Sequence, residues 1–485
     1  MRYAKWLAIA SAIAAGVALR VWLYRSSAVP EDSDEAIVGL MARHLLHGEV
    51  TTFYWGQPYG GSQEVYLVAG VFAIFGTSLA ALTVVPSVLV AIACVLVWRI
   101  GLRLFHPTAA VAAACVLWVW PPYTIAHTLR EFGFYASDLV YCALLILLAL
   151  RIVERSTLLR VAIFGLVLGL AFWQTAQIIP IAVPVIGWTA WKAPRALRHA
   201  WAGAAAAVLG ALPWLIWNVE HSWGSLLRRS DLSSYEHGLR LLVSPLLPML
   251  LGLRAPLTAQ AIVPKVLMLL IYVLLLAAFV YGAWRARHSQ RSLLYVVCVA
   301  FALIWPVSHR VTLLTSHPVY LIVVSPLLAL LVAQRATGLL RAVPLVALVA
   351  VVSIVSLHRM EVWYRTDTDH WPATLPRSFA PLSSLLERLD VHHIYADYWI
   401  GYRLSFDTRE RVISTEYLYT GLRVEDGRLV PSPRPATRYP PWQREVEHSD
   451  HAFVVFRKDP MPRKLLAAHG YERHVVGPFA VYARR

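Results

Sequence analysis

A cluster of carboxylates near the N-terminus is the first group of residues in this sequence that could do chemistry. Glu31, Asp32, Asp34 and Glu35 fall within five residues, directly before apolar residues with helical spacing. Such carboxylates can cap a helix, since Asp32 fits the N-cap and Glu35 its third residue. A carboxylate here can also act as a general base that takes a proton from a hydroxyl group. The pattern alone leaves both interpretations open.

A segment rich in aromatic and amide side chains follows that predicted helix. Trp55, Tyr59 and Gln63 precede Glu64, which opens a short apolar helix after two consecutive glycines. Aromatic faces stack on the C–H faces of a pyranose, and amides or carboxylates bond its hydroxyls. An aromatic belt at a membrane surface would also explain Trp55 and Tyr59. It would not explain the glycine turn or Glu64, so we interpret the segment as a candidate sugar site.

A third polar group lies where an apolar segment begins. Arg130, Glu131 and Asp138 fall in this stretch, and an ionisable residue entering a membrane span predicts function. The alternatives are an Asp138–Arg130 ion pair or an Asp138 that rests at the interface. A phosphate leaving group would also need cations, and the available ones are Arg228, Arg229, Arg240, Arg254 and Arg310. Each of these could equally be a solvated or headgroup-binding charge.

Composition indicates what must position these residues. The chain has 485 residues, of which 58% are hydrophobic and 15% charged, against about 25% charged in soluble domains. We predict two regions, a membrane domain over residues 1–358 and a soluble α+β domain over residues 359–485. The segment up to His358 carries 25 basic and 12 acidic residues, an excess that suits loops between spans. Nucleic acid is therefore not an expected partner.

Eleven apolar stretches are long enough to be candidate spans. They cover residues 5–24, 79–98, 108–126, 136–152, 158–176, 178–191, 200–217, 264–284, 293–308, 318–334 and 342–358. With the N-terminus in the cytoplasm, every inner connection collects arginine or lysine, as the positive-inside rule requires. The C-terminal domain and the long loops 25–78 and 218–263 then lie outside. The 13-residue apolar stretch 64–76 is too short to span and is expected to lie at the interface.

The C-terminal region has the pattern of a small α+β domain. Helical spacing covers 379–389, and strand character is found at 394–396, 412–414 and 453–456. The segments 471–476 and 479–482 flank Gly477-Pro478 and predict a closing hairpin. All four cysteines fall inside apolar stretches of the membrane region, so neither disulfides nor a cysteine metal site is expected.

These motifs together resemble the GT-C superfamily of membrane glycosyltransferases, in particular protein O-mannosyltransferases and lipid A aminoarabinose transferases. Asp34-Glu35 is similar to the Asp-Glu pair of the first outer loop of that superfamily. The stretch 61–67 looks like its second juxtamembrane helix, and 130–138 resembles its second acidic motif. The stretch 316–321, which includes Tyr320, is similar to a late Arg-Tyr-Leu element. One departure is Val65, because aminoarabinose transferases carry a phosphate-contacting lysine at that position.

The resemblance implies an inverting glycosyltransferase that uses a polyprenyl-phosphate-linked sugar and a hydroxyl acceptor on a glycan, lipid or protein. It implies that Asp34 is the base and that Glu35, Glu64 and Asp138 position the acceptor or sugar. Arg130, Arg228, Arg229 or Arg310 would hold the lipid phosphate. The remaining candidate substrate-binding residues are Trp55, Tyr59, Gln63, Glu131 and Tyr320. No cofactor or metal is expected, because the histidines show no ligand spacing.

Two other functions remain as alternatives. A transporter or lipid flippase would place ionisable residues deep within spans and would show two related halves. In this sequence the carboxylates gather in the predicted outer loops. A scaffold that binds a partner through its outer domain would leave the acidic first loop unexplained.

Overall fold

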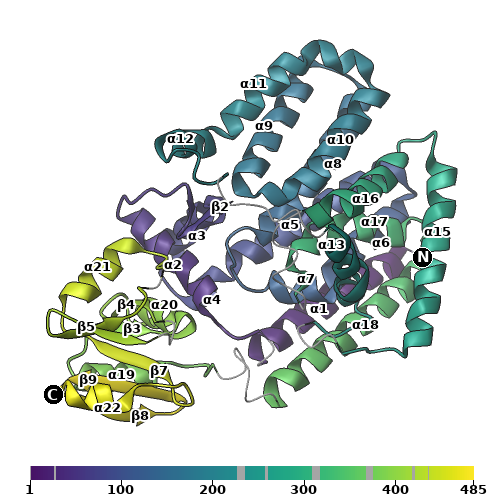
Figure 1. Ribbon diagram of the computed structural model, residues 1–485. Helices are drawn as coiled ribbons and strands as arrows, with labels where there is room; N and C mark the ends of the chain where they lie inside the picture. The colour runs from purple at the N-terminus through teal and green to yellow at the C-terminus, as the bar shows by residue number, and fades with distance from the viewer. Residues whose placement is uncertain are drawn as a thin grey trace.

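The computed structural model describes residues 2–26, 29–226, 235–256, 260–307, 317–366, 375–417, 421–434 and 436–484. A large helical part runs from α1 to α18, and a C-terminal part carries a five-stranded sheet (Figure 1). We call residues 375–484 of the described chain the C-terminal domain. The helix before it, α18 (Leu339–Thr366), runs past the boundary expected at residue 358.

The helical part contains α-helices of very different lengths. In chain order they are α1 (Arg2–Arg25), α2 (Ser33–Leu46), α3 (Gln63–Phe75), α4 (Leu79–Leu82), α5 (Val84–Leu104), α6 (Pro107–Val119), α7 (Pro122–His127), α8 (Tyr135–Glu154), α9 (Leu158–Gln174), α10 (Ile179–Lys192), α11 (Ala200–Gly210), α12 (Leu212–Glu220), α13 (Tyr235–Leu241), α14 (Leu247–Leu251), α15 (Lys265–Ala286), α16 (Ser292–Ile304), α17 (Ser325–Ala333) and α18. A short hairpin of β1 (Phe53–Tyr54) and β2 (Gln57–Gly61) connects α2 to α3.

Five of the described helices are long and apolar enough to cross a membrane, or six if the bent pair 194–210 and 212–220 is one span. The chain is therefore a multi-pass membrane protein. Within the described residues, each of the eleven predicted stretches contains helix, but six are short, broken or bent. Pro121 and Pro122 lie at the break between α6 and α7, where proline removes a backbone donor and interrupts a helix. The count of eleven spans stays a prediction.

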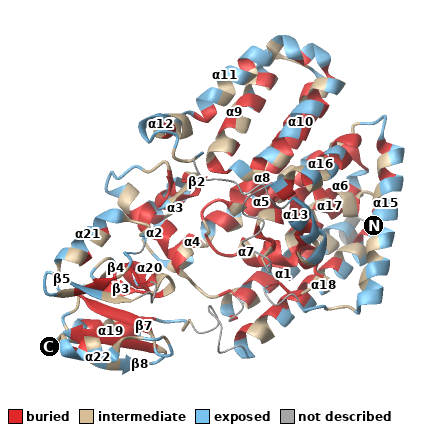
Figure 2. Ribbon diagram, in the orientation of Figure 1, coloured by how far each residue is buried: buried red, intermediate tan, exposed pale blue. Residues whose placement is uncertain are grey.

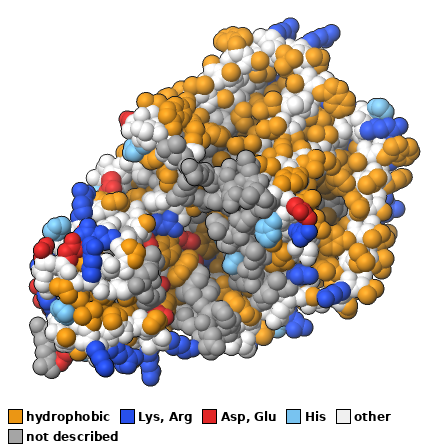
Figure 3. All heavy atoms as spheres, in the orientation of Figure 1, with side chains coloured by type: hydrophobic (Ala, Val, Ile, Leu, Met, Phe, Trp, Pro, Cys, Tyr) orange, Lys and Arg blue, Asp and Glu red, His pale blue; other side chains and the backbone are white. Residues whose placement is uncertain are grey.

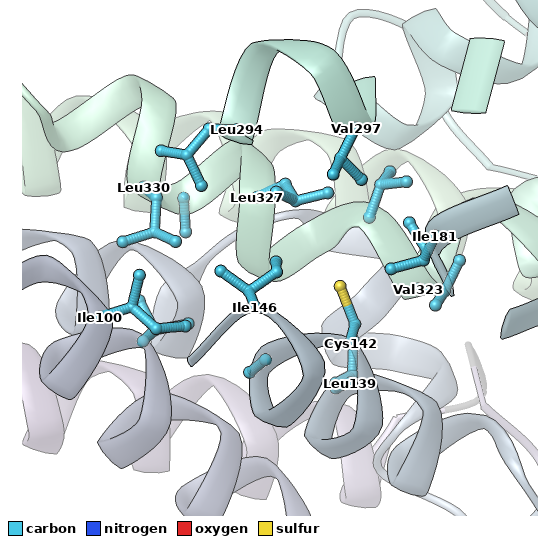
Figure 4. Packing of buried hydrophobic residues seen from close by; sticks show 14 of the residues in the cluster. Ile100, Leu139, Cys142, Ile146, Ile181, Leu294, Val297, Val323, Leu327 and Leu330 are labelled. Carbon is cyan, nitrogen blue, oxygen red and sulfur yellow. The ribbon is translucent and has the colours of Figure 1, made fainter. Parts of the chain in front are cut away.

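Apolar side chains form both the interior and much of the surface of the helical part. Figure 4 shows Ile146 and Cys142 of α8 packed against Leu327 of α17 and Val297 of α16. Helix α15 has no buried residue in its most apolar window, and most of it is exposed in Figure 2. In Figure 3 hydrophobic side chains cover most of this part in the view, whereas charged side chains gather over the C-terminal domain. An apolar surface of this extent suits contact with lipid.

Helices α9 and α11 approach each other through glycines. A Cβ at Gly165 would lie 1.9 Å from the carbonyl oxygen of Gly203, and one at Gly169 would lie 2.0 Å from that of Ala207. Small residues four apart let two helix backbones pack closely, which is a common device in membranes. We call this contact the α9–α11 glycine seam.

The C-terminal domain is a mixed sheet covered by helices, in agreement with the predicted α+β class. Its strands are β3 (His393–Ala396), β4 (Ile413–Glu416), β7 (Ala452–Phe456), β8 (Tyr471–Val476) and β9 (Phe479–Arg484), in the order β4-β3-β7-β9-β8. Strand β3 pairs in parallel with β4 and β7, while β9 pairs antiparallel with β7 and β8. A second sheet pairs β5 (Leu422–Glu425) with β6 (Arg428–Pro431).

Four helices complete the C-terminal domain, and sequence analysis predicted only the first of them. They are α19 (Ala380–Arg388), α20 (Tyr398–Asp407), α21 (Pro440–His448) and α22 (Arg463–Ala468). Helix α20 connects β3 to β4, as a parallel pair requires a crossover connection. The predicted hairpin is confirmed, with Gly477 at a φ of 55° in its turn.

Helix α2 of the first loop packs on helix α20 of the C-terminal domain. A buried cluster joins Leu40 and Met41 of α2 to Tyr402 and Phe406 of α20. Gly39 is required at this contact, since a Cβ there would lie 2.3 Å from the ring of Phe406. The predicted acidic loop is thus held against the C-terminal domain.

Candidate active site

Helix α2 positions the acidic cluster, and only one of its carboxylates is used as a cap. Asp32 is the N-cap, and its side chain accepts hydrogen bonds from the backbone N–H groups of Asp34 and Glu35 at 3.0 and 3.2 Å. The helix ends near Gly48, which has a φ of 92°. The capping interpretation therefore holds for Asp32. It leaves Asp34 in the first turn, at the positive end of the helix dipole.

The side chain of Asp34 contacts the C-terminal domain. The hydroxyl of Tyr398 in α20 donates a hydrogen bond to Oδ1 of Asp34, and the hydroxyl of Tyr54 donates to its backbone carbonyl at 2.7 Å. Burial raises the pKa of Asp34 above its ordinary value, while the Tyr398 hydrogen bond and the charge of Arg438 lower it. Asp34 is therefore a carboxyl group held by a hydroxyl, as a general base can be.

Arg438 lies beside this pair and belongs to the loop between β6 and α21. Its Nη2 donates to the Tyr398 hydroxyl at 3.4 Å, and its backbone N–H donates to the Tyr402 hydroxyl at 2.9 Å. Its guanidinium lies 5.1 Å from the ring centroid of Tyr398 and 6.0 Å from that of Tyr54. Aromatic faces at these distances stabilise a cation.

Glu35 and Arg130 take part in a buried ion-pair network. Nη1 of Arg130 lies 3.5 Å from Oε2 of Glu35 and 3.3 Å from Oε1 of Glu31. Arg403 of α20 pairs with the other oxygen of Glu31 at 2.7 Å and with Asp407 at 2.8 Å. Burial raises the pKa of Glu35 to about 7, although the charge of Arg130 opposes this shift. The network joins the start of α2, the loop before α8 and the C-terminal domain.

Glu64, Glu131 and Asp138 form a second acidic group, which is buried. The backbone N–H and the hydroxyl of Ser137 both donate to Oε1 of Glu64, at 2.9 and 2.6 Å. Burial and the charge of Glu64 raise the pKa of Glu131 well above its ordinary value. Neither carboxyl oxygen of Asp138 has a hydrogen-bond partner among the described residues. Arg130 pairs with Glu31 and Glu35, so the alternative of an Asp138–Arg130 ion pair is wrong.

The aromatic and amide candidates lie in different surroundings. Trp55 is 7% exposed and stacks on Tyr439 of the C-terminal domain, with ring centroids 4.1 Å apart. Gln63 donates to the carbonyl of Leu170 at 2.7 Å, which ties it to α9. The structure thus places Trp55 and Gln63 in packing positions.

Tyr59 and Tyr320 contact aromatic residues around the start of α8. Tyr59 is half-buried, and its hydroxyl donates to Gln57. Tyr320 lies in a 3₁₀ segment, Pro318–Val324, and its ring centroid is 6.5 Å from that of Tyr135. The ring centroid of Tyr59 lies 6.3 Å from that of Phe134, which lies 4.4 Å from that of Tyr135, so Tyr59 and Tyr320 both lie near the start of α8.

Three of the predicted phosphate-binding residues, Arg228, Arg229 and Arg310, lie outside the described residues. Val65, at the position where the resemblance would place a phosphate-contacting lysine, is fully buried. No group of three histidine, cysteine, aspartate or glutamate residues that could hold a metal ion is found within the described ranges. Among the described residues, the cations next to Glu35 and Asp34 are therefore Arg130 and Arg438.

Sequence reasoning missed Tyr398 and Arg438. Tyr398 is separated from Asp34 by 364 residues, and Arg438 follows a proline-rich loop in a soluble region. No local pattern connects either residue with the first loop.

Comparison with known proteins gives one family and one full-length fold. Residues 64–217 match the family described as dolichyl-phosphate-mannose-protein mannosyltransferase. A search of curated protein sequences gives no match. Asp34 lies N-terminal to the matched segment, whereas Glu64, Arg130 and Asp138 lie within it. The family match therefore covers these three residues but not Asp34.

Solved structures extend the comparison to the whole chain. Apo ArnT from Cupriavidus metallidurans gives a TM-score of 0.63 at 14% identity, covering 99% of this chain and 98% of that chain. The same protein bound to undecaprenyl phosphate gives 0.61 at 13% identity, covering 96% and 97%. The oligosaccharyltransferase of Archaeoglobus fulgidus gives 0.47 at 15% identity, covering 85% of this chain and 64% of that chain.

The resemblance to GT-C membrane glycosyltransferases is thereby confirmed, and the fold is of that class. Within the class, the match over the full length is to ArnT.

Proposed function

We propose that this chain is an inverting glycosyltransferase that moves a sugar from a polyprenyl-phosphate donor to a hydroxyl acceptor. The family match and the ArnT-like fold support a glycosyltransferase and speak against the transporter alternative. The ArnT structure with undecaprenyl phosphate supports a donor of this chemical class. The acceptor is a glycan, lipid or protein hydroxyl.

The observation that carries the proposal is the setting of Asp34. Its carboxylate stands in the first turn of α2, free of the capping role that Asp32 fills, and is oriented by Tyr398. In the proposed reaction Asp34 takes the proton of the acceptor hydroxyl while the oxygen of that hydroxyl attacks the anomeric carbon of the sugar. The bond from that carbon to the phosphate oxygen breaks, and the phosphate leaves with the electron pair. Attack opposite the leaving group inverts the configuration.

The other acidic residues have supporting roles in this proposal. Glu35 and Arg130 hold the start of α2 through their ion pair. Glu64 and Asp138 lie in the buried acidic group at the starts of α3 and α8, and in this proposal their carboxyl groups hydrogen-bond a sugar hydroxyl. Tyr59 and Tyr320 are the aromatic candidates for contact with the donor.

The proposed location is the outer face of the cytoplasmic membrane. The arginine-rich connections between the predicted spans support an N-terminus in the cytoplasm. With eleven spans, the C-terminal domain and α2 would both lie outside. The contact between α2 and α20 agrees with this arrangement, because it requires the two to share one side of the membrane.

The test is transfer by the Asp34→Asn variant of the purified protein in lipid. We expect turnover of polyprenyl-phosphate sugars to fall about 10²- to 10⁴-fold, because the amide cannot accept the proton. Thermal unfolding should stay close to that of the wild type. The matched control is Asp390→Asn, whose side chain is 96% exposed in the C-terminal domain. If Asp34→Asn kept most of its activity, Asp34 would not be the base.

A further inference from the structure

Arg438 is placed at the candidate site by several independent contacts. Its backbone N–H is fixed by Tyr402, and its segment packs closely on Gly56 of the turn between β1 and β2. Gly56 has a φ of 65°, and a Cβ there would lie 3.0 Å from Cδ of Arg438. The turn is therefore shaped so that this arginine can approach α2.

One hydroxyl bridges Arg438 and Asp34. Tyr398 donates to the carboxylate of Asp34 and accepts from Nη2 of Arg438. Two successive hydrogen bonds keep the guanidinium within about 6 Å of the carboxylate. A phosphate that contacts Arg438 would thus have its bonded sugar carbon close to Asp34.

The charge of Arg438 is available to an anion. Arg130 and Arg403 are each ion-paired with carboxylates. Within the described part of the chain, the guanidinium of Arg438 donates to the neutral hydroxyl of Tyr398, while its backbone N–H bonds the Tyr402 hydroxyl and the Glu416 carboxyl. With its amide oxygen turned toward Arg438, Gln57 also accepts from both terminal nitrogens. A phosphate is a stronger acceptor than these neutral oxygens, and the planar guanidinium can bind it through two bonds.

From these contacts we propose that Arg438 of the C-terminal domain binds the phosphate of the lipid-linked donor. The C-terminal domain then supplies part of the active site, with Tyr398 as a positioning residue between Arg438 and the base. This inference rests on the proposed function, and it adds the residue that recognises the leaving group. It also assigns a role to a domain whose sequence indicates none.

The experiment measures binding of undecaprenyl phosphate to the full-length protein in lipid nanodiscs. We expect Arg438→Gln to raise the Kd about 10- to 100-fold, as the loss of charge-assisted hydrogen bonds predicts. Arg438→Lys should give a smaller increase, because it keeps the charge but loses the fork. The matched control is Arg434→Gln in the same loop, since Arg434 pairs with Glu425 and Glu447. It should bind as the wild type does.

Competition identifies the source of the phosphate. Inorganic phosphate and phosphatidylglycerol should displace undecaprenyl phosphate only weakly. Equal displacement by phosphatidylglycerol would show a general headgroup site and overturn the proposal. Wild-type affinity in Arg438→Gln would overturn it too, as would an equal loss in Arg434→Gln. If Arg438→Gln does not fold, an unchanged Kd in a folded Arg438→Lys would contradict the proposed bidentate contact.

Asp34→Asn separates this inference from the proposed function. The variant should still bind undecaprenyl phosphate while losing transfer, because the base does not hold the phosphate. If Arg438→Gln lost binding but Asp34→Asn kept transfer, the phosphate site would stand and the assignment of the base would fail. If the wild-type protein bound no polyprenyl phosphate, the donor class itself would fail together with this inference.

Discussion

At the scale of single residues, two opposing effects act on the carboxyl group of Asp34. Burial raises its pKa, whereas the hydrogen bond from Tyr398 and the charge of Arg438 lower it. A general base must be unprotonated to accept a proton. The two residues of the C-terminal domain therefore favour the form of Asp34 that the proposed reaction needs.

Tyr398→Phe should move the acidic limb of the pH–rate profile to higher pH. The hydrogen bond from Tyr398 lowers the pKa of Asp34, so its removal raises that pKa and leaves less carboxylate at a given pH. The measurement is kcat/KM against pH for the variant and the wild type. Tyr439→Phe is a suitable control, because that hydroxyl donates to Glu49. A profile that loses height at every pH without shifting would contradict the role of Tyr398.

The sequence pointed to some residues of the candidate site and not to others. Asp34 stood out because four carboxylates in five residues are unusual before an apolar helix. The partners of Arg130 could not be derived, because a buried arginine pairs with whatever carboxylates the fold supplies. Tyr398 and Arg438 had no signal, since their roles depend on contacts between segments far apart in the chain.

At the scale of elements, apolar length predicted where helices form but not where they break. All eleven predicted stretches contain helix in the part of the chain that the structure describes. However, two stretches that appear continuous in the sequence are each divided into two helices, one into α6 and α7 and the other into α11 and α12. Hydropathy averages over a window, and a break depends on a few prolines and their neighbours. In the C-terminal domain, the strands of the five-stranded sheet were predicted from their strand character, while β5 and β6 were missed. The short helix α20 was missed too, although it forms the contact with α2.

The α9–α11 glycine seam gives a prediction for helix packing. Gly165→Leu should destabilise the folded protein by about 1–3 kcal/mol or more, because its Cβ would meet the backbone of Gly203. Thermal unfolding of the purified protein measures the effect.

Gly187→Leu in α10 is the matched control for that substitution. A Cβ at Gly187 meets no atom within 4 Å, so this variant reports only the change in helix propensity and lipid-facing surface. Equal unfolding temperatures of the two variants would show that the seam tolerates a separation of the helices.

At the scale of the whole molecule, a histidine links the two parts of the chain. Nε2 of His44 lies 2.9 Å from Glu410 of the C-terminal domain, and Nδ1 lies 2.7 Å from Glu49 of the first loop. Burial lowers the pKa of His44, but the hydrogen bonds to the two glutamates outweigh it and raise the pKa above its ordinary value.

Stability should therefore fall as pH rises through the pKa of His44. A raised pKa in the folded state contributes stability that is fully present below the ordinary histidine value of about 6.5 and is lost above it. The thermal unfolding temperature, measured from below about pH 6.5 upward, should show this decline in stability. The part of the decline that depends on His44 should be absent in His44→Gln. His448→Gln, an exposed histidine of α21, is the control. If the unfolding temperature of His44→Gln fell with pH by the same amount as that of the wild type, groups other than His44 would cause the decline.

The separation of Asp34 and Tyr398 along the chain has a consequence for biosynthesis. A ribosome adds about 5–20 residues per second, so the 364 residues between them take about 20–70 s to translate. During that interval the nascent chain carries the proposed base in the membrane without the hydroxyl that orients it. The active site is then completed only near the end of translation, which would prevent an unfinished chain from consuming the donor.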